Sequence, residues 1–180
     1  MLRSASHLKD YVLHAKDGEI GRCKDFLFDD EYWTVRYMVA DTGKWLPKRR
    51  VIISPVTLAD PDWQSGRLPV DLTKRQIEDA PHLDADAPVS RQREIEYSRY
   101  FGWAYYWTGI GVWGMHARPK LLAEEQKRRA ESVDEEEIGD SHLRSTEEVT
   151  GYHIQATDGE VGHIEDFIID DDTWTIRYLV

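Results

Sequence analysis

The chain contains one stretch of sequence twice, and this repeat constrains the fold more than any other feature. Residues 4–39 align with residues 145–180 at a constant offset of 141, without a gap, and 16 of the 36 aligned pairs are identical. The identical pairs include the Asp-Gly-Glu sequences that begin at Asp17 and Asp158. Self-similarity of this extent indicates two modules of one fold.

Each copy has the pattern of an antiparallel β-meander. Short runs rich in β-branched and aromatic residues alternate with turn signals, and the Asp17-Gly18 pair favours a hairpin because Gly tolerates the positive φ of a tight turn. The first copy continues into further short strands near Val51, bounded by Pro47 and Pro55, where a missing amide donor costs little. Such closely spaced strands suit a small closed β-barrel.

The second copy ends in the middle of this pattern. Val180 aligns with Val39, which lies within an expected strand, and residues 41–58 have no counterpart after it. We therefore expect the second barrel to be incomplete. Either the chain is a truncated form of a longer protein, or the open edge of this barrel associates, for example in a homo-oligomer.

The expected fold is thus mainly β, with two small barrels joined by a partly helical linker. The predicted domains are a first barrel over 4–72, the linker over 73–144 and the N-terminal part of a second barrel over 145–180. A capping box formed by Thr73 and Gln76 begins the first helix of the linker. The remaining predicted segments are a connection over 84–88, helices over 90–101 and 120–132, and an acidic spacer over 134–140.

The linker contains the best candidate for a docking site, an aromatic segment after its second predicted helix. Tyr and Trp side chains supply large contact areas at little entropic cost and dominate binding hot spots. The alternative is that the same side chains pack against the first barrel or between the two barrels. The candidate docking residues are Tyr100, Phe101, Trp103, Tyr105, Tyr106, Trp107 and Trp113.

The composition argues against several classes of partner. The net charge of −11 makes nucleic-acid binding an unfavourable function, because such binding requires Lys and Arg to neutralise phosphates. A local basic run at Lys44, Lys48, Arg49 and Arg50 is either a docking patch or a solvated barrel edge. The sequence has no secretion signal or membrane-spanning pattern and only one cysteine, so we expect a cytoplasmic protein, either free or peripheral at the inner membrane.

The repeat also tests individual residues for chemistry. Cys23 aligns with Ile164, which predicts a buried apolar position, and the histidines have no zinc-ligand spacing. The acidic clusters 29–31 and 170–172 could bind a divalent cation, but each lies where a tight turn is expected and Asp is favoured. We therefore predict no catalytic, cofactor or metal residue, and no enzymatic activity.

A second interpretation concerns two charged pairs that are present in both copies. Asp25 and Arg36 lie on neighbouring expected strands, as do their counterparts Asp166 and Arg177. Opposite charges on adjacent strands can face each other, so the sequence predicts a structural ion pair between Asp25 and Arg36.

Several motifs together resemble the PRC-barrel domain. They are Gly18-Glu19-Ile20-Gly21, the Asp25–Asp29 segment, the Trp33–Val39 segment and Val51–Pro55. This family includes the cytoplasmic barrel of the photosynthetic reaction centre H subunit, the barrel of ribosome maturation factors, and stand-alone bacterial proteins, which the tandem arrangement resembles most. The resemblance covers residues 4–58 and 145–180.

The resemblance and the residues together favour a non-catalytic docking or adaptor protein with a protein partner that the sequence does not identify. The H-subunit resemblance implies an alternative, a peripheral component of a photosynthetic or electron-transport membrane complex. A third hypothesis is a divalent-metal site formed by the carboxylate clusters.

Overall fold

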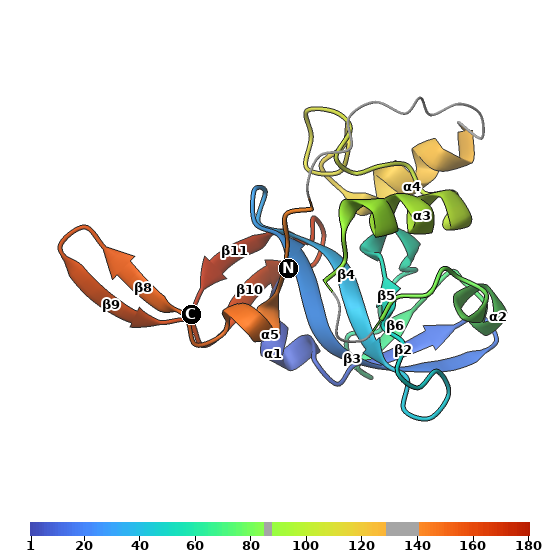
Figure 1. The fold of residues 1–180 in the computed structure, drawn as a ribbon, viewed down its shortest axis with the longest axis horizontal. Helices are drawn as coiled ribbons and strands as arrows, with labels where there is room; N and C mark the ends of the chain where they lie inside the picture. The colour runs from blue at the N-terminus through green and yellow to red at the C-terminus, as the bar shows by residue number, and fades with distance from the viewer. Residues whose placement is uncertain (85–87, 129–140) are drawn as a thin grey trace.

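The fold of the chain, seen here in a computed structural model that describes residues 1–84, 88–128 and 141–180, is mainly β (Figure 1). The strands pair into several sheets, and within these described residues none of the sheets closes into a barrel. The strands are β1 (Leu2–Ser4), β2 (Val12–Ala15), β3 (Gly18–Asp29), β4 (Thr34–Asp41), β5 (Val51–Ile53), β6 (Arg67–Pro69), β7 (Leu143–Ser145), β8 (His153–Ala156), β9 (Gly159–His163), β10 (Phe167–Asp170) and β11 (Ile176–Leu179). The helices are α1 (Ala5–Leu8), the 3₁₀ helix η1 (Pro55–Thr57), α2 (Lys74–Glu78), α3 (Arg91–Phe101), α4 (Pro119–Arg128) and α5 (Thr146–Val149).

The first copy forms a strongly bent sheet with the order β5-β4-β3-β2-β6. The predicted antiparallel pairing of β2, β3, β4 and β5 is confirmed, whereas β6 adds to β2 in parallel. The two outer strands, β5 and β6, are connected through η1 and a bridge between Leu58 and Val70. The sheet therefore encloses a core while its hydrogen-bonded order stays open.

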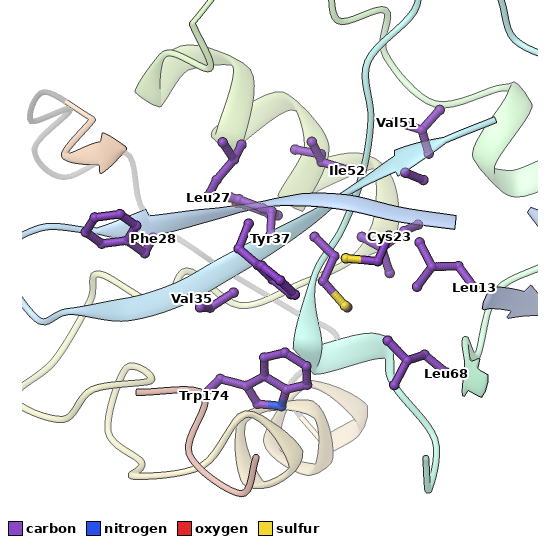
Figure 2. Packing of buried hydrophobic residues seen from close by; sticks show 14 of the residues in the cluster. Leu13, Cys23, Leu27, Phe28, Val35, Tyr37, Val51, Ile52, Leu68 and Trp174 are labelled. Carbon is purple, nitrogen blue, oxygen red and sulfur yellow. The ribbon is translucent and has the colours of Figure 1, made fainter. Parts of the chain in front are cut away.

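The core of the first copy follows from the alternation of apolar residues on these strands. Leu13, Phe26, Met38, Ile53 and Leu68 are each fully buried. Figure 2 shows these strands from close by, with Trp174 of the second copy lying in the same cluster. The two copies thus share one hydrophobic core.

The copies are joined by a reciprocal exchange of strands. Strand β1 precedes the first copy but pairs with β10 of the second, with Leu2 opposite Asp170. Strand β7 precedes the second copy but pairs with β3 of the first, with Leu143 opposite Asp29. Because all four positions are related by the offset of 141, the two pairings are the same interaction made twice.

The exchange is centred on the pair Thr34 and Thr175, which are aligned positions and form a β-bridge with each other. Around this bridge, the amide of Val35 donates to the carbonyl of Trp174, and the amide of Ile176 donates to the carbonyl of Trp33, at 2.8 and 2.7 Å. Both tryptophans have positive φ, 49° and 60°. A residue that pairs with its own counterpart lies on a local two-fold axis, so the repeat is also a symmetry of the structure.

Two aspartates fix the exchanged segments. Asp25 accepts hydrogen bonds from the Ser145 and Thr146 hydroxyls, at 2.5 and 2.6 Å, and from the amide of Glu147 at 3.0 Å. Its counterpart Asp166 accepts from the hydroxyls of Ser4 and Ser6 and from the Ser6 amide. Each carboxylate therefore binds the start of the short helix that belongs to the other copy.

The second copy departs from the first beyond this shared centre. Its counterpart of the long strand β3 is divided into β9 and β10. Strands β8 and β9 form a separate hairpin, which pairs with no other described strand and projects from the rest of the molecule (Figure 1).

The helices of the linker agree with the sequence. Thr73 and Gln76 form the predicted capping box of α2. Ser90 caps the N-terminus of α3, and Gly102 ends this helix in the left-handed conformation that Gly adopts without strain. Helix α4 confirms the start of the predicted helix 120–132. Residues 85–87, the end of that helix and the spacer over 134–140 lie outside the described residues.

We expect Asp25→Ala to destabilise the fold by about 3 kcal/mol, because it leaves three donors without their charged acceptor in a buried place. Asp166→Ala should cost less, about 1 kcal/mol, because this carboxylate is more exposed. Urea unfolding of both variants, followed by circular dichroism, measures the difference. Equal losses would contradict the role given to Asp25.

Candidate docking surfaces

The aromatic segment divides into a buried part and a surface part. Its first residues end α3, and the rest forms loops that, with α3 and α4, lie along one side of the first copy (Figure 1). Tyr106 and Trp113 are buried, whereas Phe101, Trp103, Tyr105 and Trp107 are half-buried and Tyr100 is exposed. Two of the seven candidate docking residues therefore belong to the core.

Arg36 anchors the buried part. Its guanidinium lies 4.0 Å from the ring centre of Tyr106 and 4.9 Å from that of Trp113. The same group donates to the carbonyl of Val112 at 2.5 Å and to the carboxylate of Asp29 at 3.1 Å. One cation thus attaches the aromatic segment to strand β4 through charge, hydrogen bonding and ring contact.

The ion pair predicted between Asp25 and Arg36 is therefore wrong. The register of β3 against β4 shifts between Leu27 and Phe28, which directs Arg36 toward Asp29 instead. Asp25 faces the exchanged segment of the other copy. The second copy repeats the observed pairing, because Arg177 binds Asp170 at 3.0 Å.

A second buried group lies beside Arg36 and is centred on Glu94 of α3. This carboxylate accepts hydrogen bonds from the hydroxyls of Tyr37 and Tyr106, at 3.1 and 2.7 Å, and from Arg91 at 2.8 Å. Ser141 also donates to it, at 3.3 Å. Helix α3, strand β4 and the aromatic segment therefore meet at one fully buried carboxylate.

Burial shifts the pKa values of this group. Desolvation raises the pKa of Glu94, although Arg91 and the tyrosine hydroxyls oppose the shift. Desolvation also raises the pKa of Tyr37 and Tyr106, and it lowers the pKa of Arg36. Since each side chain is satisfied by the others, the group acts as a polar connection within the fold. No sequence pattern singled out Glu94, because a lone Glu in a helix resembles a solvated residue.

The surface part of the aromatic segment exposes few apolar groups. The rings of Phe101 and Trp103 stack at 4.5 Å, and those of Tyr105 and Trp107 stack at 4.7 Å. Beyond them, Ile110 is 93 % exposed and Met115 is 62 % exposed. These last two residues, here called the loop surface, are one candidate for contact with a partner.

The second copy presents a larger apolar area, which comparison with the first copy reveals. Tyr11, Ile20, Tyr37 and Met38 are buried, but their counterparts in the second copy are exposed. These counterparts, here called the open surface, are Tyr152, Val161, Tyr178 and Leu179. In the first copy, β5, β6 and α3 cover the matching positions; among the described elements none covers the open surface.

The predicted basic run borders a groove of about 440 Å³ in the first copy. The groove is lined on one side by Lys48, Arg49 and Arg50 and on the other by Glu147 and Glu148 of the exchanged helix α5. Arg49 donates to main-chain carbonyls at the end of α2, so it serves the fold. The basic run therefore faces acidic side chains of the other copy.

The other candidates for chemistry occupy the positions expected of structural residues. Cys23 is buried, and desolvation raises the pKa of its thiol, as its alignment with an isoleucine predicts. Asp29 accepts hydrogen bonds from the amides of Glu31 and Tyr32, which confirms the predicted turn. Within the described residues, no three His, Cys, Asp or Glu side chains are grouped in a way that could hold a metal ion.

Comparison with known proteins gives no relative for this chain: no model of a known protein family matches it, and no curated protein is similar to it in sequence. Among the helices that are described, none is long and apolar enough to cross a membrane. The resemblance to the PRC-barrel domain remains a prediction from the sequence motifs.

We expect Arg36→Met to destabilise the protein by about 3–5 kcal/mol, because it leaves the buried carboxylate of Asp29 without its partner. Arg177→Met is the matched control. Its ion pair is solvent-exposed, so the expected cost is about 0–1 kcal/mol. Chemical unfolding of both variants gives the comparison, and a small loss for Arg36→Met would contradict its role as the anchor.

Glu94 predicts a dependence of stability on pH. Its pKa is raised from 4.5 by folding, so between 4.5 and the raised value the folded protein binds the additional proton. The free energy of unfolding from this group is therefore largest below pH 4.5 and declines as pH rises, by at most about 1.4 kcal/mol per pH unit. Unfolding curves for the wild type and Glu94→Gln should show this decline only in the wild type. A wild-type excess that grows with pH would contradict it.

Proposed function

We propose that this protein is a non-catalytic docking module built from two copies of a PRC-barrel type of fold. One copy is covered by its own chain, and the second copy offers its matching surface to a partner. The observation that carries the proposal is the exposure of the open surface. Tyr37 is 2 % exposed and its counterpart Tyr178 is 61 % exposed, although both have the same neighbours in sequence.

The strand order supports strand addition as the way in which a partner docks. In the first copy β4 pairs with β3 on one side and with β5 on the other. In the second copy β11 pairs with β10 alone and is the edge of its three-stranded sheet. An edge strand presents a row of main-chain hydrogen-bonding groups, which partners use in β-augmentation.

The polar groups of the protein support docking over catalysis. Glu94 is saturated by two tyrosines and Arg91, and Asp29 by Arg36 and two amides. A catalytic acid or nucleophile needs access to a substrate, but these carboxylates are buried under the aromatic segment or in the β3–β4 turn. Their chemistry is used to hold the fold together.

The test is affinity capture of the tagged protein from its own cells, with soluble and membrane fractions analysed separately by mass spectrometry. We expect one stoichiometric partner, and we expect Leu179→Glu in the open surface to remove it. Ile110→Glu in the loop surface is the matched control, since it adds the same charge at another exposed apolar residue.

Recovery of the bait alone from both fractions would contradict the docking proposal. Recovery with a membrane complex would assign the protein to the peripheral role that the reaction-centre H subunit resemblance implies.

A further inference from the structure

The charge of the second copy indicates the chemistry of what binds there. Residues 146–180 contain nine Asp or Glu and a single basic residue, Arg177. The aligned residues 5–39 contain seven acidic and five basic residues. The difference arises because the remaining basic positions of the first copy are occupied in the second by Thr150, Thr157, His163 and Glu165. The copy with the open surface is therefore strongly acidic.

Acidic side chains surround the open surface itself. Asp158 and Glu160 lie at the turn of the β8–β9 hairpin and in β9, and both are exposed. Glu165 lies between β9 and β10, and its side chain is 71 % exposed. A basic partner would lower the repulsion between these groups, whereas a second copy of the same surface would increase it.

The first copy shows what kind of segment fits the matching position. Strand β5 pairs with β4 through Val51, Ile52 and Ile53, all of them buried. Directly before it lie Lys48, Arg49 and Arg50, and residues 42–58 contain no acidic residue. The segment that covers the first copy is thus an extended strand with a basic run followed by β-branched apolar residues.

We propose that the edge strand β11 of the second copy binds an extended segment of a partner protein that carries a basic run followed by β-branched apolar residues. The main chain of this segment adds to β11 as β5 adds to β4. Its apolar side chains cover Tyr178 and Leu179, and its basic side chains face the acidic groups of the β8–β9 hairpin. This inference rests on the docking function proposed above and specifies its partner.

The test uses a fluorescent synthetic peptide with the sequence of residues 44–54, Lys-Trp-Leu-Pro-Lys-Arg-Arg-Val-Ile-Ile-Ser, titrated with the full chain. We expect saturable binding that weakens as salt rises, because exposed charges are screened. A peptide with its four basic residues replaced by glutamate should bind at least about tenfold more weakly. A scrambled peptide of the same composition should also bind more weakly, because strand addition requires the apolar residues in sequence.

Protein variants locate the site. Leu179→Glu and Glu165→Lys should each weaken peptide binding about tenfold, the first by removing apolar cover and the second by restoring the charge found at Lys24 of the first copy. Ile110→Glu should leave the affinity unchanged, because Ile110 lies on the loop surface. Melting temperatures of the three variants confirm that each is folded.

Three results would overturn the inference. One is equal affinity for the basic, the glutamate and the scrambled peptides, and another is peptide binding that Leu179→Glu does not weaken. The third is a dimer, measured by light scattering, that Leu179→Glu dissociates, because the occupant would then be a second copy. If the peptide fails but Leu179→Glu still removes a cellular partner, the docking function holds and only the chemistry of the partner is wrong.

Discussion

Strands β1 and β7 each pair with the copy to which they do not belong, and the rest of the structure depends on this exchange. The bridge between Thr34 and Thr175 makes the exchange symmetric, and the carboxylates of Asp25 and Asp166 fix its two ends. Neither copy can complete its strand pairing from its own residues. The linker between the copies is therefore free to serve a second purpose, which is to cover the first copy with α3 and the aromatic segment.

Nearly identical sequences have different environments in the two copies, and this asymmetry separates structural residues from available ones. Arg36 and Arg177 both pair with an aspartate seven positions earlier, but only Arg36 is buried beneath Tyr106 and Trp113. The difference comes from what covers each copy and not from the local sequence. A repeat thus provides an internal control, in which the covered copy shows how the uncovered one can be completed.

The sequence was sufficient for features that depend on local physics. The repeat, the β-meander, the cap of α2 and the end of α3 at Gly102 were all predicted, because turns and caps are determined within a few residues. The strand exchange was not predicted, since Leu2 and Asp170 are brought together only by tertiary packing. The bulge that turns Arg36 toward Asp29, and the burial of Glu94, depend on the same packing.

The exchange also sets an order of events during synthesis. Strand β3 ends at Asp29, but its partner β7 begins 114 residues later, at Leu143. At ~5–20 residues per second, the ribosome needs roughly 6–20 s to supply β7 after β3 is complete. Throughout this interval the first copy has an unsatisfied strand edge and Asp25 has no donors from its exchanged segment. The nascent chain is therefore most exposed to mispairing with neighbouring chains before its second repeat has been translated.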